Sequence, residues 1–189
     1  MFEQPSSLAG MEQGAFVLAA AFADDPLMTY FWPASARRRK ALPGFWESRI
    51  ASRRKNGLVD LAHDAAGDLA CVALWEPANV VSPTVKPLTL LRALGLGTAR
   101  ALSAGRRMEH ARPATPHLYL AAIGTLPGVR GRGLATALLE RRLSVAEQDC
   151  FLISNTSGTV PFYRRFGFEP QGELPIDGGP VVYPMIRKK

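Results

Sequence analysis

The chain has 189 residues, of which 47% are hydrophobic, so it is long enough to bury the core of one ordinary domain. Its formal net charge of +7 favours acidic ligands, and both a polyphosphate cofactor and a nucleic acid satisfy that preference. The two cysteines, Cys71 and Cys150, form neither a zinc motif nor a disulfide framework, which fits a reducing compartment. The N-terminal residues lack a basic and apolar leader, and no run reaches the roughly 18 apolar residues of a membrane span. We therefore expect a cytoplasmic protein that does not contact a membrane.

The first third of the chain is expected to be helical. Apolar side chains recur at helical spacing from Leu8 to Phe22. A second helical stretch, rich in arginine around Arg37, runs toward Arg54. We expect an interruption near Pro43, because proline lacks the N–H group that a helix interior uses.

A hairpin and a further helix are expected next. Leu58–Ala62 and Leu69–Trp75 have the composition of two strands, joined by a turn at Asp64–Asp68. The second strand is nearly all apolar and is therefore expected to lie in the middle of a sheet. A proline-containing loop, Pro77–Pro87, follows, and the pattern then predicts a helix from about Leu88 to Met108.

The next segment predicts a strand, a glycine-rich turn, a helix and a second strand. We expect the strands at His117–Thr125 and Phe151–Ser154, with the helix at Leu134–Gln148 between them. This order predicts a βαβ crossover whose strand-to-helix corner is the turn. The turn and the start of the helix read LPGVRGRGLATALLE, from Leu126 to Glu140.

The glycine-rich turn predicts a binding site for a phosphate group. The first turn of a helix has unpaired N–H groups and the positive end of the helix dipole, and Gly131 and Gly133 leave the backbone uncovered there. Arg130 and Arg132 add positive charge nearby. Hydrogen bonds to a charged group contribute roughly 1.5–3 kcal/mol each, against roughly 0.3–1 kcal/mol for the dipole, so the N–H groups should dominate. The segment fits neither a Walker loop nor a GxGxxG motif, and a helix start without a ligand is the alternative.

Two motifs in the C-terminal half resemble the signatures of the GNAT-fold N-acetyltransferases. Arg130, Gly133 and Ala135 fill the family's glycine motif, Q/R-x-x-G-x-G/A. The segment VPFYRRFGFEP, residues 160–170, is similar to the second signature, a short helix that bears a tyrosine and leads into a strand. The chain looks closest to the puromycin-acetyltransferase-like branch of the family.

The resemblance implies an α/β protein with the GNAT fold, a single domain whose central, mixed, twisted sheet is flanked by helices. Residues 1–57 would form a helical acceptor-side region, and residues 58–189 would form the sheet and the acetyl-CoA-binding core. The implied reaction moves an acetyl group from acetyl-CoA to a primary amine of a small molecule by direct attack on the thioester. Coenzyme A is then the product, no metal is implied, and the protein would be a monomer or a homodimer.

The same resemblance implies which residues bind the donor. The turn would hold the pyrophosphate of coenzyme A, and the end of the preceding strand would pair its backbone with pantetheine. The implied contacts are Ile123, Gly124, Thr125, Arg130, Gly131, Arg132, Gly133, Leu134, Ala135, Thr136, Asn155, Thr159, Phe162 and Arg165. Thr159 stands where the family usually has an asparagine, and Arg165 could equally lie on a solvated helix face.

Tyr163 matches the position of the family's general acid. The role is chemically reasonable, because a phenol with a pKa near about 10 can protonate a thiolate whose thiol has a pKa near roughly 8.5. The alternative is that Tyr163 is an amphipathic core residue whose hydroxyl reaches the outer surface.

The strand before the glycine turn lacks the carboxylate that many relatives carry as a base, since its sequence is LYLAAIGT. An alkylammonium with a pKa near about 10.4 is neutral only about once in 2,500 molecules at pH 7, so its proton must be removed. We therefore expect either a weakly basic acceptor, such as an α-amino group, or a water relay to His117, Glu109 or His110. Each of these three could equally be a surface residue.

The acceptor pocket is expected to come from the N-terminal third and from the loop after Trp75. The segment AFADDPLMTYFWP supplies two acids and three aromatic residues that suit a cationic, partly apolar amine. These residues are Asp24, Asp25, Tyr30, Phe31 and Trp32. Alternatively, the aspartates cap a turn at Pro26 and the aromatic side chains belong to the core. His63, on or beside the hairpin, is expected to be structural.

Two other functions remain open from the sequence. Nucleic-acid binding is suggested by the basic residues of 37–40 and by Arg53, Arg54 and Lys55. A charge run of this kind is usually a solvated helix face and no nucleic-acid motif accompanies it, so we do not expect nucleic acid as a partner. The other alternative is a GNAT fold that binds acyl-CoA as a sensor without catalysis, against which the presence of Tyr163 argues.

Overall fold

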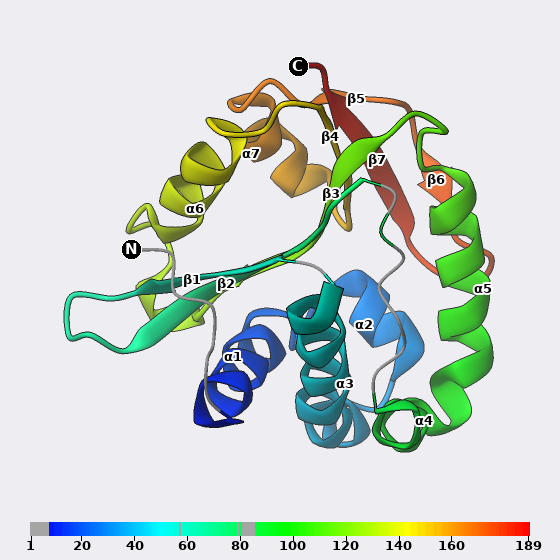
Figure 1. Cartoon of the computed structure of the whole chain (residues 1–189). Coiled ribbons are helices and arrows are strands. Elements are labelled where there is room, and N and C mark those ends of the chain that lie inside the picture. Colours follow the sequence, from blue (N-terminus) through cyan, green and yellow to red (C-terminus); the bar gives the residue numbers. More distant parts are fainter. Residues whose placement is uncertain (1–7, 57, 79, 81–85) are drawn as a thin grey trace.

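A mixed sheet runs through the middle of the computed structural model, which describes residues 8–56, 58–78, 80 and 86–189 (Figure 1). Its strands are β1 (Leu58–His63), β2 (Leu69–Glu76), β3 (His117–Thr125), β4 (Asp149–Ser154), β5 (Glu169–Pro170), β6 (Leu174–Pro175) and β7 (Val181–Arg187). Among the described residues the order is β1-β2-β3-β4-β7-β5, and β6 pairs with β7. The β3–β4 pair is parallel, as a βαβ crossover requires, and the other pairs in this order are antiparallel.

Helices cover both faces of this sheet. They are α1 (Leu8–Ala21), α2 (Pro26–Phe31), α3 (Ser35–Asn56), α4 (Pro87–Leu94), α5 (Thr98–His110), α6 (Leu134–Leu143) and α7 (Val160–Arg164). In Figure 1, α1 and α3 lie below β1, β2 and β3, whereas α6 and α7 lie above them. Short 3-10 turns occupy Gly95–Gly97, Pro127–Val129 and Ser157–Thr159.

Each layer of helices encloses its own core. Leu18, Leu42 and Ile50 are buried between the sheet and the N-terminal helices. Leu139 and Phe168 are buried on the other face, with the alternate β2 residues Cys71, Ala73 and Trp75. Because helices cover both faces, residues 70–76 of β2 are all buried. All of them are apolar except the last, Glu76. The predicted α/β fold with a central mixed sheet and flanking helices is confirmed.

The predicted interruption at Pro43 is wrong, because α3 continues through that residue. Leu42, Phe45 and Trp46 around it are buried in the core. Tertiary packing of this apolar face therefore outweighs the loss of one backbone hydrogen bond.

Two predicted helix boundaries are also wrong. The helix expected from Leu88 to Met108 is divided into α4 and α5 by a turn in which Gly95 has a φ of +50°. A Cβ on Gly97 would lie 2.6 Å from the carbonyl oxygen of Phe31, so the chain passes directly against α2 at this break. The helix expected to reach Gln148 ends at Leu143, since the chain must turn back before β4 begins.

Strands β3 and β4 separate along their length, and this separation creates the site. They pair from His117 opposite Asp149 to Leu120 opposite Leu152, and beyond that point β3 has no β4 partner. A register shift between β2 and β3 lies at the same level, at Leu74 and Trp75. Such irregularities redirect side chains and are common beside active sites. From Ala121 onward β3 pairs with β2 on one edge, and its other edge, which faces β4, is unpaired and available to a ligand.

Candidate active site

One cleft of about 1360 Å³ runs from the turn before α6, through the gap between β3 and β4, to the inner sides of α3 and α5. Pockets for a single drug-sized ligand usually measure about 300–1,000 Å³, so this cleft has room for two substrates. Fourteen of the fifteen residues predicted to bind the donor or act as the acid line it, and Arg132 does not. The lining members are Ile123, Gly124, Thr125, Arg130, Gly131, Gly133, Leu134, Ala135, Thr136, Asn155, Thr159, Phe162, Tyr163 and Arg165.

The glycine-rich turn forms one end of the cleft. Gly131 and Gly133 have φ values of +78° and +80°, in the left-handed region that favours glycine. A Cβ on either would meet nothing within 4 Å, so the backbone faces open space. No side chain caps α6, and the N–H groups of its first turn are therefore available to an anion.

Arg130 is engaged in holding this turn in place. Its Nη2 donates to the carbonyl of Ala21 at 2.9 Å, and its Nε donates to the carbonyl of Thr125 at 3.4 Å. These bonds tie the turn to α1 and to β3. Arg132 is exposed and lies outside the cleft lining, and its contact with the donor stays a prediction.

The end of β3 is pressed against α1. A Cβ on Gly124 would lie 2.8 Å from the Cβ of Ala21 and 3.0 Å from Cδ2 of Leu18. Glycine at this position therefore allows the helix to approach the strand closely. Thr125, the last residue of β3, donates from its hydroxyl to the sulfur of Cys71 at 3.1 Å.

Tyr163 lines the cleft from α7. Its ring packs edge-on against Phe162 and Phe168, with centroids 5.3 Å and 6.2 Å away. Burial raises the pKa of Tyr163 above its ordinary value, and the negative charge of Asp25 raises it further. The phenol is therefore protonated at neutral pH and in the form that can donate a proton.

Asp25 is a cleft carboxylate whose catalytic potential the sequence did not reveal. Its Oδ1 accepts from the backbone N–H groups of Leu27 and Met28 at 2.9 Å and 3.1 Å, which caps α2. Its Oδ2 accepts from Nδ2 of Asn155 at 3.0 Å. Burial raises the pKa of Asp25 above its usual range, and these hydrogen bonds offset only part of that effect. The capping alternative holds for Asp25, and the same carboxylate lines the cleft.

Asp24 differs from its neighbour. Its side chain is 96% exposed and pairs with Nη2 of Arg38 at 3.4 Å. It lies among the residues that line the cleft, but it is solvated there. A carboxylate in water interacts weakly with an opposite charge, so Asp25 supplies the stronger negative charge on this wall.

Three more of the side chains predicted to contact the donor already contact other residues of the protein. The amide of Asn155 bonds to Asp25, as described. The hydroxyl of Thr159 lies 2.5 Å from the hydroxyl of Ser154, at the end of β4. The guanidinium of Arg165 lies 6.0 Å from the ring centroid of Phe162.

The three residues predicted to receive a proton through a water relay lie outside the cleft lining. His117 is buried between Nε of Arg112, at 3.3 Å, and the carbonyl of Thr115, at 2.8 Å. Glu109 pairs with Arg112 at 3.2 Å, and His110 is exposed beside the carbonyl of Arg106. The water relay therefore stays a prediction. Asp25, by contrast, lines the cleft, and its charge raises the pKa of Tyr163.

The predicted acceptor aromatics divide between cleft and core. Phe31 lines the cleft. Trp32 is buried in the core and its Nε1 donates to the carbonyl of Ala93 at 3.0 Å. Tyr30 lies outside the lining, and its hydroxyl donates to the carbonyl of Asp177 at 2.8 Å. His63 ends β1 and is exposed, at the hairpin.

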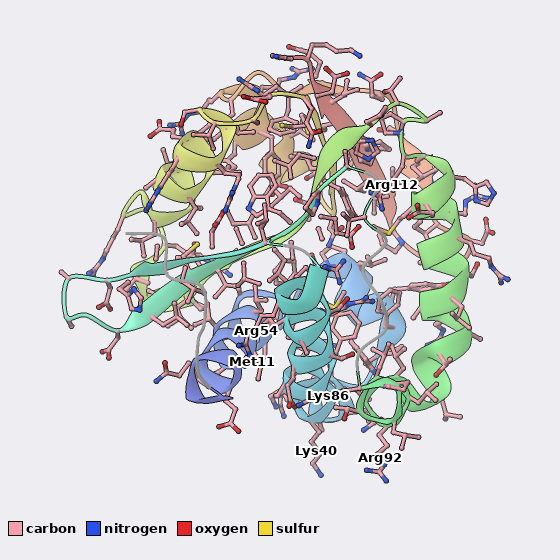
Figure 2. All side chains as sticks on the ribbon, in the orientation of Figure 1. Met11, Lys40, Arg54, Lys86, Arg92 and Arg112 are labelled. Carbon is pink, nitrogen blue, oxygen red and sulfur yellow. The ribbon has the colours of Figure 1, made fainter. Side chains whose placement is uncertain are left out.

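Arginines form the opposite end of the cleft, which the sequence did not reveal. Arg49 and Arg53 lie one turn apart on α3 and line the cleft with Tyr119 of β3. Arg53 donates to Oε1 of Glu76, the buried last residue of β2, and Nη1 of Arg112 lies 3.1 Å from Oε2 of that carboxylate. Figure 2 shows Arg112 beside β3, where the chain leaves α5. We call these five residues the arginine end.

The basic stretch of α3 is therefore not one solvated face. Arg38 is buried, and its Nη1 donates to the carbonyl of Trp32 at 2.8 Å. Arg53 lines the cleft. Lys40, on the same helix, points away from the sheet (Figure 2). Arg54 donates to the sulfur of Met11 at 3.0 Å. This division removes much of the basis for the nucleic-acid hypothesis.

Among the residues that the structure describes, no helix has the length and apolarity to cross a membrane. The same residues contain no group of three or more histidine, cysteine, aspartate or glutamate side chains that could hold a metal ion.

Comparison with known proteins identifies the fold. Residues 93–170 match the family described as Acetyltransferase (GNAT) domain. A structure described as histone acetyltransferase HPA2 and related acetyltransferase, from Corynebacterium glutamicum, is 26% identical, with a TM-score of 0.78 over 98% of this chain and 94% of that one.

Two further structures share the fold. The polyamine N-acetyltransferase of Drosophila melanogaster is 18% identical, with a TM-score of 0.66 over 98% of each chain. The PaiA N-acetyltransferase of Thermoplasma acidophilum, in complex with coenzyme A, is 11% identical, with a TM-score of 0.59 over 100% of this chain and 99% of that one. The matched domain therefore covers the glycine-rich turn, α6 and α7, and the whole chain shares the fold of these acetyltransferases.

Proposed function

We propose that the protein is an acetyl-CoA-dependent N-acetyltransferase that acetylates a primary amine of a small molecule by direct attack on the thioester. The observation that carries this proposal is that one cleft contains the glycine-rich turn, the unpaired part of β3, Tyr163 and Asp25. The Drosophila relative forms N-acetylagmatine, which is the product of acetylating a small amine. The resemblance to the puromycin-acetyltransferase-like branch stays a prediction.

The donor would bind along the first half of the cleft. The N–H groups at the start of α6 would hold the pyrophosphate, beside Gly131 and Gly133. The edge of residues 121–125 that lacks a β4 partner would hydrogen-bond the pantetheine amides as an additional strand does. In support, the Thermoplasma relative with this fold binds coenzyme A.

Asp25 and Tyr163 would then divide the proton transfers. Asp25 accepts a proton from the acceptor ammonium, and the neutral nitrogen attacks the thioester carbonyl. The C–N bond forms and the C–S bond breaks, while Tyr163 donates its proton to the departing thiolate. The new amide nitrogen loses its second proton, which restores the phenol of Tyr163, and Asp25 releases its proton to solvent. The products are the amide and coenzyme A with a free thiol. Because burial raises the pKa of Asp25, the gap between this pKa and that of the acceptor ammonium is smaller. Proton transfer from the ammonium to Asp25 is therefore less unfavourable.

The test is release of free thiol from acetyl-CoA with a panel of amines, including agmatine, polyamines, aminoglycosides, aminoacyl nucleosides and peptide N-termini. We expect turnover with at least one amine, and Tyr163→Phe should lower kcat by about 10² or more, as loss of a general acid does. Tyr183→Phe, on β7 and outside the cleft lining, is the matched control. Tight binding of acetyl-CoA without thiol release on any amine would support the sensor alternative instead.

A further inference from the structure

The arginine end of the cleft carries more positive than negative charge. Arg49, Arg53 and Arg112 surround one buried carboxylate, that of Glu76. Glu109 is the other carboxylate that reaches Arg112, and it is 69% exposed. Arg49 has no carboxylate within ion-pair distance in the described ranges.

Several donors in this cluster lack an acceptor. The side chain of Arg53 is only 7% exposed, and its Nε and Nη1 are buried without a hydrogen-bond partner among the described residues. Nε of Arg49 is likewise buried and unpaired in that part of the chain. Buried guanidinium donors are almost always satisfied by protein, by water or by a ligand. Burial and the charge of Arg53 also lower the pKa of Arg49 to about 10, as expected where positive charge is in excess.

The surroundings indicate the rest of the ligand. Apolar and aromatic side chains line the cleft beside the arginines: Phe45, Trp46, Leu90, Leu94 and Met108. Tyr119 stands four positions before Ile123 on β3, about 13 Å along an extended strand. The arginine end therefore lies at the other side of the strand gap from the glycine-rich turn, where the acceptor would enter.

We propose that Arg49 and Arg53 bind a carboxylate of the acceptor, so that the preferred substrate is an amine that also carries a carboxylate on an apolar body. This inference rests on the proposed N-acetyltransferase function. The planar fork of a guanidinium matches the two oxygens of a carboxylate, and an ion pair shielded from water discriminates strongly against an acceptor that lacks the anion. Arg53 is partly committed to Glu76, so Arg49 is the specificity-determining residue.

Matched acceptor pairs test this proposal directly. Phenylalanine and phenethylamine differ by one carboxylate, as do arginine and agmatine. γ-Aminobutyrate and propylamine also differ by one carboxylate, with a longer spacing between the amine and the carboxylate. We expect at least one pair to favour the acid by about tenfold or more in kcat/KM, the effect of one charge-assisted hydrogen bond. Arg49→Met should lower that ratio at least about tenfold. Arg54→Met, which contacts Met11 outside the cleft lining, should leave it unchanged.

Three results would overturn the inference. The parent enzyme could turn over amines with no preference for a carboxylate in any pair, or Arg49→Met could reduce both members of a pair equally. A third result is that Arg49 discriminates succinyl-CoA from acetyl-CoA and does not discriminate between acceptors, which would assign the carboxylate to the acyl group. Circular dichroism and melting temperature verify that each variant is folded.

Binding separates this inference from the proposed chemistry. Calorimetry with N-acetylphenylalanine and N-acetylphenethylamine requires no turnover. If no amine releases thiol but the acid still binds about tenfold more tightly in an Arg49-dependent manner, the proposed function fails and the carboxylate site stands. If turnover occurs and neither ligand is preferred, the inference fails and the proposed function stands.

Discussion

The side-chain amide of Asn155 donates to Oδ2 of Asp25 at 3.0 Å and joins the end of β4 to the start of α2, across 130 positions of sequence. Oδ1 of the same aspartate is held by two backbone N–H groups. The carboxylate is therefore fixed in a single orientation, and its charge acts on Tyr163. The contact therefore holds the proposed base, Asp25, against the end of β4.

The first prediction concerns Asp25 as the base. Asparagine caps a helix as well as aspartate does, so Asp25→Asn should retain α2 while removing the proton acceptor. We expect kcat/KM for the acceptor to fall by about 10²-fold or more. In the parent, kcat/KM should decrease as the pH drops through the pKa of Asp25, which burial raises above the usual range of aspartate, and this dependence should vanish in the variant.

Asp68→Asn, on the exposed hairpin turn, is the control for this experiment. A pH profile whose only ionisation follows the pKa of the acceptor amine would contradict the role of Asp25. The same outcome would favour the weakly basic acceptor that needs no protein base.

The second prediction concerns stability. Because burial raises the pKa of Asp25 in the folded protein, the protonated form is favoured by folding. The stability that this group contributes is present below its unfolded pKa and is lost as the pH rises through its folded pKa. Asp25→Asn is neutral at every pH, so its melting temperature relative to the parent should increase between pH 4 and pH 7. A difference that is independent of pH, measured by thermal denaturation at both values, would show that ionisation of Asp25 does not oppose folding.

The third prediction concerns the contact between β3 and α1. In Gly124→Ala, the new methyl group would lie 2.8 Å from Ala21 and 3.0 Å from Leu18, inside a packed region. Overpacking of this kind costs typically about 1–3 kcal/mol, and the displaced strand should also bind coenzyme A more weakly. Urea unfolding and calorimetry measure the two effects. Gly128→Ala is the matched control, because its methyl group would meet nothing within 4 Å, and equal behaviour of the two variants would refute the close approach.

How far the site could be predicted depends on how local its parts are in sequence. The glycine-rich turn and Tyr163 belong to short motifs with adjoining elements of clear periodicity, so the sequence was sufficient to predict their place beside the sheet. The hairpin and the β3-α6-β4 unit were equally local, and their strands were predicted to within two residues.

The parts that could not be predicted depend on contacts between distant segments. The pairing of Asp25 with Asn155 has no sequence signal beyond an aspartate that precedes a proline. The break between α4 and α5 lies where Gly97 passes against the carbonyl of Phe31, a residue far earlier in the chain. The sequence predicted Arg53 to lie on a solvated basic face, but in the structure it pairs with Glu76 of β2. Each of these depends on packing that one sequence does not encode locally.

The last prediction concerns Glu76, which holds the arginine end together. Its carboxylate accepts from Arg53 and Arg112, and both it and the Arg53 side chain are 7% exposed. Removing one partner from a buried ion pair leaves an uncompensated charge and typically costs about 3–5 kcal/mol. Glu76→Gln should therefore lower the free energy of unfolding by an amount of that order in urea titrations. Glu109→Gln removes an exposed partner of the same Arg112 and should cost less than about 1 kcal/mol. Because a bound carboxylate would replace part of the lost negative charge, N-acetylphenylalanine should restore more stability to Glu76→Gln than N-acetylphenethylamine does. Equal effects of the two ligands would mean that the arginines are neutralised without a substrate carboxylate.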